Sequence, residues 1–86
     1  MHAIEVLELA MEVATRQGYR IRQEYLGGSG GGACEFAGKK WIFVDLALNT
    51  VEQVEQVIEA LEADPGVRQN ELPAPLERLI TARRAA

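Results

Sequence analysis

The chain has 86 residues, 48% of them apolar and 26% charged, which are the proportions of an ordinary soluble globular domain. We therefore expect a single domain over residues 1–86, with one modest core. Nine Lys and Arg against thirteen Asp and Glu give a net charge of −4. This is the wrong sign for a protein that is held to nucleic acid by neutralising phosphates, so no nucleic-acid partner is expected.

The residue inventory also excludes several kinds of site. One cysteine cannot form an internal disulfide, and one histidine leaves nothing from which to build a zinc site of His and Cys ligands. The longest apolar run, residues 41–44, is far shorter than the roughly 20 residues needed to cross a bilayer. The composition therefore predicts a cytoplasmic protein with no metal, no cofactor and no membrane segment.

Residues 3–17 have the spacing of an amphipathic helix, and Gly18 follows where a glycine commonly ends one. Val6, Leu9 and Val13 widen the apolar face beyond half of the circumference, which is more than one contact surface requires. We expect this helix to contact two other surfaces. The apolar residues that recur at three- and four-residue steps are Ile4, Leu7, Met11 and Ala14.

Three strands are predicted next, over residues 19–26, 33–37 and 41–46. The first alternates in the way that is typical of an outer strand with one face in water. On the third strand, Trp41 and Phe43 point to one side and aliphatic residues point to the other. The third strand is therefore apolar on both faces, and both faces need cover.

A second helix is predicted over residues 50–63, with Asn49 or Thr50 as its N-cap. Residues 67–72 form either a short strand or a loop. A short last helix begins near Pro75, because proline is favoured in the first turn of a helix.

The predicted fold class is α+β, in the order helix, three-stranded antiparallel sheet, helix and short C-terminal helix, in two layers. The two long helices cover one face of the sheet. The other face is covered either by the C-terminal helix or by the same face of a second copy in a twofold dimer.

Residues 27–32 contain five glycines and one serine. The spacing matches the nucleophile elbow of hydrolases and the dinucleotide fingerprint, but both motifs open a helix, whereas a strand is predicted here. We interpret the segment mainly as a bend or connector. The alternative is a pocket of backbone N–H groups for an anion or a peptide end, with the candidate binding residues Gly28, Ser29, Gly30, Gly31, Gly32 and Cys34.

Two further residues have a chemical and a structural interpretation. Cys34 is either a reactive thiol near a cluster of N–H groups or a small buried apolar residue, and the second interpretation is favoured. Asp45 is either a buried functional acid or a hydrogen-bond acceptor for the turn and for amides near the next helix, and again the second is favoured. No catalytic residue is predicted, because no second catalytic group is identifiable.

The chain resembles a family of short uncharacterised bacterial proteins. The shared pattern is Gly18-Tyr19 after a helix, a glycine loop from Leu26 to Gly32, Cys34 on a strand, Asp45 at a strand end and a later Leu-Pro-x-x-Leu segment from Leu72 to Leu76. The resemblance covers nearly the whole chain and implies no activity. The chain also looks loosely like a reduced form of the zinc peptidases that carry His-Glu-x-x-His, but residues 50–63 contain no histidine, so no metal site carries over.

The sequence predicts a protein that acts by association with proteins, as a homodimer or an accessory subunit. The candidate interface residues are Val6, Leu9 and Val13 on the first helix, and Trp41 and Phe43 on the third strand. A basic cluster of Arg16, Arg20 and Arg22 either attracts the acidic face of another chain or balances its own acidic helices. The alternative function is a small-ligand or anion-binding module that uses the glycine loop.

Overall fold

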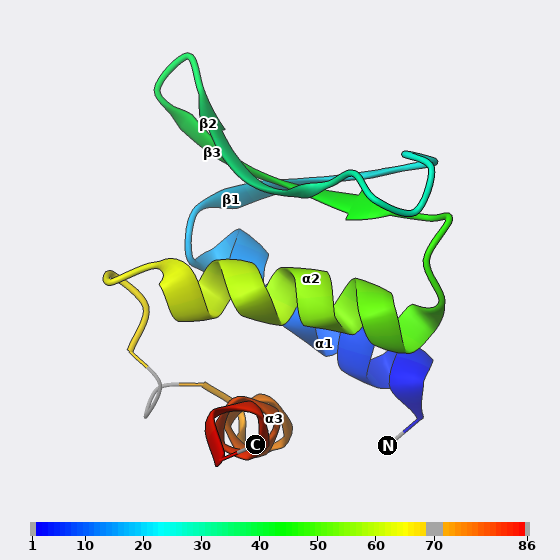
Figure 1. The fold of residues 1–86 in the computed structure, drawn as a ribbon. Helices are drawn as coiled ribbons and strands as arrows, with labels where there is room; N and C mark the ends of the chain where they lie inside the picture. Colours follow the sequence, from blue (N-terminus) through cyan, green and yellow to red (C-terminus); the bar gives the residue numbers. More distant parts are fainter. Residues whose placement is uncertain (1, 69–71, 86) are drawn as a thin grey trace.

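A computed structural model describes residues 2–68 and 72–85 of the chain. The α+β class is confirmed, with three helices and three strands in this part (Figure 1). No helix within it has the length and apolar character that crossing a membrane requires. The elements are α1 (Ala3–Arg16), β1 (Tyr19–Glu24), β2 (Gly32–Phe36), β3 (Lys39–Asp45), α2 (Thr50–Ala63) and α3 (Ala74–Ala85).

The sheet is mixed, so the prediction of three antiparallel strands is wrong for one pair. The strand order is β1-β3-β2, in which β3 pairs parallel with β1 and antiparallel with β2. The central place suits β3 because it is the strand with apolar side chains on both faces, while the more polar β1 takes an edge, as predicted. The chain must then cross the carboxyl end of β3 on its way from β1 to β2. Residues 25–31 make that crossing. From here on they are called the glycine loop, and Gly32, the last glycine of the predicted segment, is the first residue of β2.

Both long helices lie on the same face of the sheet (Figure 1). Ile42 and Val44 of β3 point toward them and are fully buried. The buried apolar residues form one cluster that includes residues from all three helices. The prediction that α1 contacts more than one surface is confirmed, because it packs against β1, α2 and α3.

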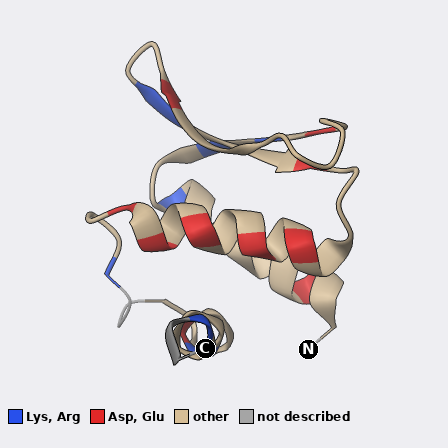
Figure 2. Cartoon of the chain, viewed as in Figure 1, with Lys and Arg blue, Asp and Glu red and all other residues tan. Residues whose placement is uncertain are grey.

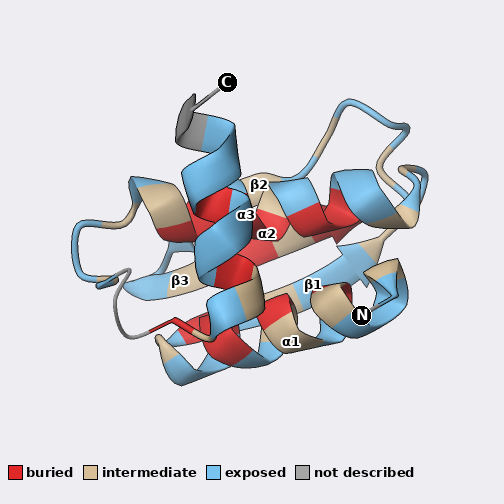
Figure 3. Ribbon diagram, turned by 90° about the horizontal axis from the view of Figure 1, so that it is seen from below, coloured by how far each residue is buried: buried red, intermediate tan, exposed pale blue. Residues whose placement is uncertain are grey.

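The C-terminal helix does not cover the other face of the sheet, so this one of the two alternatives predicted for that face is wrong. It lies across α1 and α2 on the side away from the sheet, so the molecule has three layers and not two (Figure 3). Its buried residues Leu76 and Ile80, with Leu72 before it, join the same core. The wide apolar face of α1 is the physical reason, since it extends beyond what the sheet and α2 can cover. The opposite face of the sheet stays without a helix.

The ends of the helices follow local sequence signals. Gly18 has a φ of +95° directly after α1, a conformation that favours glycine. Asn49 is the N-cap of α2, since its side chain accepts from the Glu52 N–H at 2.9 Å and the Glu52 carboxylate accepts from the Asn49 N–H at 3.1 Å. Val67 and Arg68 lie outside any strand, and the remainder of the segment predicted as a strand or loop includes residues 69–71, which are outside the described part.

Candidate functional site

The glycine loop is fastened to the body of the protein by Asp45, which ends β3 and is fully buried. Its carboxylate accepts hydrogen bonds from the N–H groups of Leu26 at 2.9 Å, Gly28 at 2.7 Å and Ala47 at 2.9 Å. Burial alone raises the pKa of a carboxyl group, but the backbone N–H donors of the glycine loop and of the turn after β3 outweigh this and lower the pKa of Asp45. Asp45 is thus a charged acceptor that holds the loop across the end of the sheet.

Gln56 of α2 holds the same loop from the helix side. Its side-chain N–H donates to the Gly30 carbonyl at 2.9 Å, and its side-chain oxygen accepts from the Asp45 N–H at 2.8 Å. The carboxamide therefore joins the loop, the end of β3 and α2 in one network. Gln56 is not predictable as a site residue from the sequence, because nothing in its local pattern distinguishes it from the other polar residues of α2.

Close approach explains part of the glycine content of the loop. A Cβ at Gly31 would lie 2.6 Å from the Phe43 carbonyl oxygen and 2.7 Å from the Gln56 side-chain nitrogen, and the φ of Gly31 is +95°. Gly28 and Gly32 also have positive φ, but a Cβ there would meet nothing within 4 Å. Some of these glycines are thus required by their backbone conformation, and Gly31 by both conformation and space.

These contacts bear on the predicted anion pocket. Among the candidate binding residues, the Gly28 N–H already donates to Asp45, the Gly30 carbonyl already accepts from Gln56, and Ser29 lies exposed at the tip of the loop. The prediction that Asp45 accepts from the turn that follows it is confirmed by the bond from Ala47. The loop amides of Leu26 and Gly28 are thus directed at an internal carboxylate.

The favoured interpretation of Cys34 as a buried residue is wrong. Cys34 is exposed, because β2 lies at an edge of the sheet, and it lines a shallow pocket together with Ala60 and Ala63 of α2. The nearest acceptor of its thiol is the Glu35 carbonyl at 3.7 Å, a weak contact.

The structure separates the candidate interface residues into two groups. Val13 belongs to the core, and Val6 and Leu9 are partly buried at its edge. Their apolar surface is used largely inside the molecule. Trp41 and Phe43 alternate with the buried Ile42 and Val44, so they lie on the face of the sheet that has no helix, and both are partly buried.

This uncovered face, here called the open sheet face, carries three rows of side chains. By strand alternation and by register, the rows are Arg20, Arg22 and Glu24 on β1, Lys39, Trp41 and Phe43 on β3 with the buried Asp45 at its end, and Gly32, Cys34 and Phe36 on β2. Phe36 is 72% exposed. The Trp41 and Phe43 rings are stacked with centroids 6.0 Å apart, and the Arg20 guanidinium lies 5.7 Å from the centroid of the Trp41 ring.

Charge is distributed unevenly over the molecule. In Figure 2, red segments follow one another along α2, while the strands carry both blue and red segments. On α2 the acidic residues share one side, at steps of three and four: Glu52, Glu55, Glu59 and Glu62. On the open sheet face Arg22 pairs with Glu24 at 2.8 Å, whereas neither Arg20 nor Lys39 forms an ion pair within the described part of the chain. The open sheet face is thus basic on a chain that is acidic overall.

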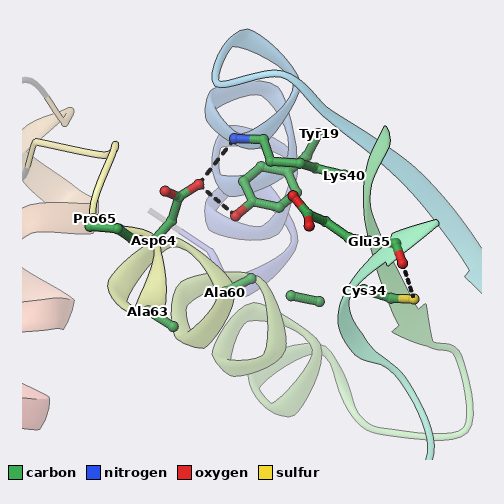
Figure 4. A pocket seen from close by; sticks show the side chains of 9 residues that line it. Tyr19, Cys34, Glu35, Lys40, Ala60, Ala63, Asp64 and Pro65 are labelled. Carbon is green, nitrogen blue, oxygen red and sulfur yellow. Dashed lines mark hydrogen bonds and ion pairs between the residues drawn. The ribbon is translucent and has the colours of Figure 1, made fainter. Parts of the chain in front are cut away.

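A second cluster, found only in the structure, lies at the opposite side of the sheet. The Asp64 carboxylate accepts from the Tyr19 hydroxyl at 2.7 Å and from the Lys40 ammonium at 3.0 Å, beside a shallow pocket of about 280 Å³ (Figure 4). The hydrogen bond from Tyr19, with those from Gly66 and Lys40, lowers the pKa of Asp64 to about 2. Burial, with the nearby Asp64 carboxylate, raises the pKa of Tyr19 to about 12. A tyrosine that holds its proton this firmly is a poor base, so the cluster is suited to joining elements.

The described residues contain no group of three or more His, Cys, Asp or Glu side chains that could hold a metal ion. Comparison with models of known protein families, with curated proteins and with solved structures finds no match. The resemblance to a family of short bacterial proteins therefore stays an expectation. The site must be interpreted from its own geometry and chemistry.

Proposed function

We propose that this protein acts by binding another protein through its open sheet face, as a small accessory subunit, and that it is not an enzyme. The observation that carries the proposal is the position of the aromatic residues. Of the five in the chain, only Tyr19 belongs to the buried core. Trp41 and Phe43 are partly buried on the open sheet face, and Phe36 is largely exposed there.

The chemistry of this face supports the same proposal. The residues that contribute most at the centres of protein interfaces are Trp, Tyr and Arg, because they bury large areas while keeping a polar or charged end. The open sheet face offers Trp41 with Arg20 directly over it. Burial of these rings by a partner would remove apolar surface from water, which is the main driving force of association.

The alternative of an anion-binding glycine loop has less support. Its N–H groups at Leu26 and Gly28 donate to Asp45, and a second anion at the same place would be repelled by that carboxylate. An enzyme built on Cys34 also has less support, since the nearest acceptor of its thiol is a backbone carbonyl and not a base.

The test is affinity capture with the full chain, tagged, from its native cells under reducing conditions. We expect to capture a stoichiometric protein partner, and Trp41→Ala should lower the captured amount by at least about tenfold, because truncation of a hot-spot tryptophan costs about 2 kcal/mol or more. The matched control is Val51→Ala, which truncates another exposed apolar side chain on α2, away from this face. Capture that is equal for the wild-type chain and Trp41→Ala would contradict the proposal.

A homodimer is the other form of association that the sequence predicts, and sedimentation equilibrium tests it. A twofold dimer through the open sheet face would bring together two faces that each carry Arg20, Arg22 and Lys39, and this accumulation of like charge is unfavourable. We therefore expect a monomer through the high micromolar range. If a dimer forms and Trp41→Ala dissociates it, the protein acts as a homodimer and not as an accessory subunit.

A further inference from the structure

The open sheet face has its arginines and its aromatic rings in register. Arg20 lies opposite Trp41 in the β1–β3 pair, and Arg22 lies opposite Phe43. Neighbouring strands are about 4.8 Å apart, and residues two positions apart on one strand are separated by about 6.6 Å. The face therefore presents a row of two cations directly beside a row of two aromatic rings.

The third row of the face leaves the rings accessible. Gly32 lies opposite Phe43, and Cys34 lies opposite Trp41. A Cβ built at Gly32 would meet nothing within 4 Å, so no described atom fills the space beside Phe43. Small residues along β2 thus give a bulky element room to approach the rings from the β2 side.

The charges of the face determine the chemistry of its partner. Arg20 and Lys39 have no ion pair within the described residues, and the Arg22–Glu24 pair is exposed to water. A basic partner would be repelled, and a neutral apolar partner would bury cations without compensation. An acidic partner would supply carboxylates to these groups and so complement the face.

The spacing of the rows favours a helix over an extended strand. A strand presents alternate residues to a surface, so it offers one row only. A helix presents neighbouring rows of residues four apart, with a rise of about 6 Å between members of a row. This rise is close to the spacing of Arg20 and Arg22, and two neighbouring rows of a helix can be acidic and apolar.

We propose that the open sheet face binds an acidic amphipathic helix of a partner protein, with its carboxylates on Arg20 and Arg22 and its apolar row on Trp41 and Phe43. This inference rests on the proposed function and specifies the partner segment as acidic, amphipathic and helical. It also assigns the basic cluster: Arg20 and Arg22 act in recognition, whereas Arg16 pairs with Glu12 of its own helix.

The test uses a designed probe and the full chain. The probe is an alanine-based helical peptide of roughly 18 residues, long enough for helicity in water, with one row of glutamates beside one row of leucines. Trp41 is the only tryptophan of the chain, so its fluorescence reports directly on the face when the peptide lacks tryptophan. Amide chemical shifts then show whether the effect is confined to the three strands.

We expect saturable quenching or enhancement of Trp41 fluorescence with shifts confined to the open sheet face. Binding should weaken when salt rises from about 0.1 M to about 1 M, which shortens the Debye length from about 10 Å to about 3 Å. The double variant Arg20→Gln and Arg22→Gln should weaken binding at least about fivefold, while Arg16→Gln, the matched control on α1, should leave it unchanged.

Several results would overturn the inference. No binding at millimolar peptide, equal binding of a peptide with glutamines in place of the glutamates, or equal binding by the double variant would each do so. Tighter binding of an oligothymidine than of the peptide would show that the face binds single-stranded nucleic acid. Self-association that Trp41→Ala abolishes would make the occupant a second copy.

The same variants separate this inference from the proposed function. If the cellular partner is lost with Trp41→Ala but retained by the Arg20→Gln, Arg22→Gln double variant, the face binds a protein that is not acidic. The proposed function then stands and the acidic helix is wrong. If both variants retain the partner, both proposals fail.

Discussion

Asp45 connects the glycine loop to the sheet through hydrogen bonds that only a carboxylate can make in full. In Asp45→Asn, one oxygen becomes an NH₂ group, which would face the N–H of either Gly28 or Leu26 without an acceptor between them. We expect amide hydrogen exchange at Gly28 to accelerate by about tenfold or more, because the loop opens more often. Glu55→Gln, an exposed acid-to-amide change on α2, is the control. Unchanged exchange at Gly28 in Asp45→Asn would show that another group holds the loop.

Gly31 and Gly32 allow the effects of backbone conformation and of space to be separated. Both have positive φ, but a Cβ would meet backbone and side-chain atoms only at Gly31. We expect Gly32→Ala to lower the free energy of unfolding by roughly 1 kcal/mol and Gly31→Ala by about 3 kcal/mol. Urea denaturation measures both values. Equal losses would mean that the loop can move away from Phe43 and Gln56 without cost.

At the scale of elements, α3 contributes to the core although it lies far from the sheet. Leu76 is fully buried, whereas Leu79 on the same helix is 37% exposed. We expect Leu76→Ala to lower the free energy of unfolding by about 2–4 kcal/mol and Leu79→Ala by less than about 1 kcal/mol. Thermal or urea unfolding of the two variants is the measurement. A small effect of Leu76→Ala would place α3 outside the cooperative unit.

The end of α2 is joined to β1 and β3 through Asp64, and this connection depends on pH. The pKa of Asp64 is about 2 in the folded protein and 3.8 in its ordinary state, so its contribution is complete above pH 3.8 and is lost as the pH falls through about 2. We expect a loss of about 1 kcal/mol across this range, less than the full shift implies because the group borders solvent. Urea denaturation of the wild-type chain and of Asp64→Asn at both ends of the range measures it.

For Asp64, the decisive comparison is the difference in stability between the wild-type chain and Asp64→Asn. This difference should shrink as the pH falls through that range, because protonated Asp64 no longer gives a charged acceptor to Tyr19 and Lys40. A difference that is constant with pH would mean that the charge of Asp64 contributes nothing to stability.

At the scale of the whole molecule, the two faces of the sheet differ. The helices cover one face, and no described helix covers the other. Two helical layers form on one side of the sheet because α1 is apolar beyond half of its circumference and packs against both α2 and α3. The opposite side has no described helix, although it carries Trp41, Phe43 and Phe36. The apolar excess of α1 therefore contributes to this chain's own core, and the proposed function depends on the sheet.

Local signals in the sequence determined a large part of this structure. The periodicity of residues 3–17 and 50–63, Gly18, and the Asn49 cap with Glu52 predict the helices closely, because helices depend on contacts within a few residues. The alternation along residues 19–24 likewise predicts an edge strand with one exposed face. The interaction of Asp45 with the turn after it was predictable for the same reason.

Tertiary structure decided what depends on contacts between distant residues. The parallel pairing of β1 with β3, the binding of the glycine loop by Gln56 and the Tyr19–Asp64 contact each join residues that are far apart along the chain. The position of α3 and the exposure of Cys34 also depend on contacts between distant residues. Several elements could cover each apolar face, and only the complete packing decides which one does. Composition predicts one acidic domain with a modest core, and the arrangement in three dimensions leaves that domain with a basic, aromatic face that no described helix covers.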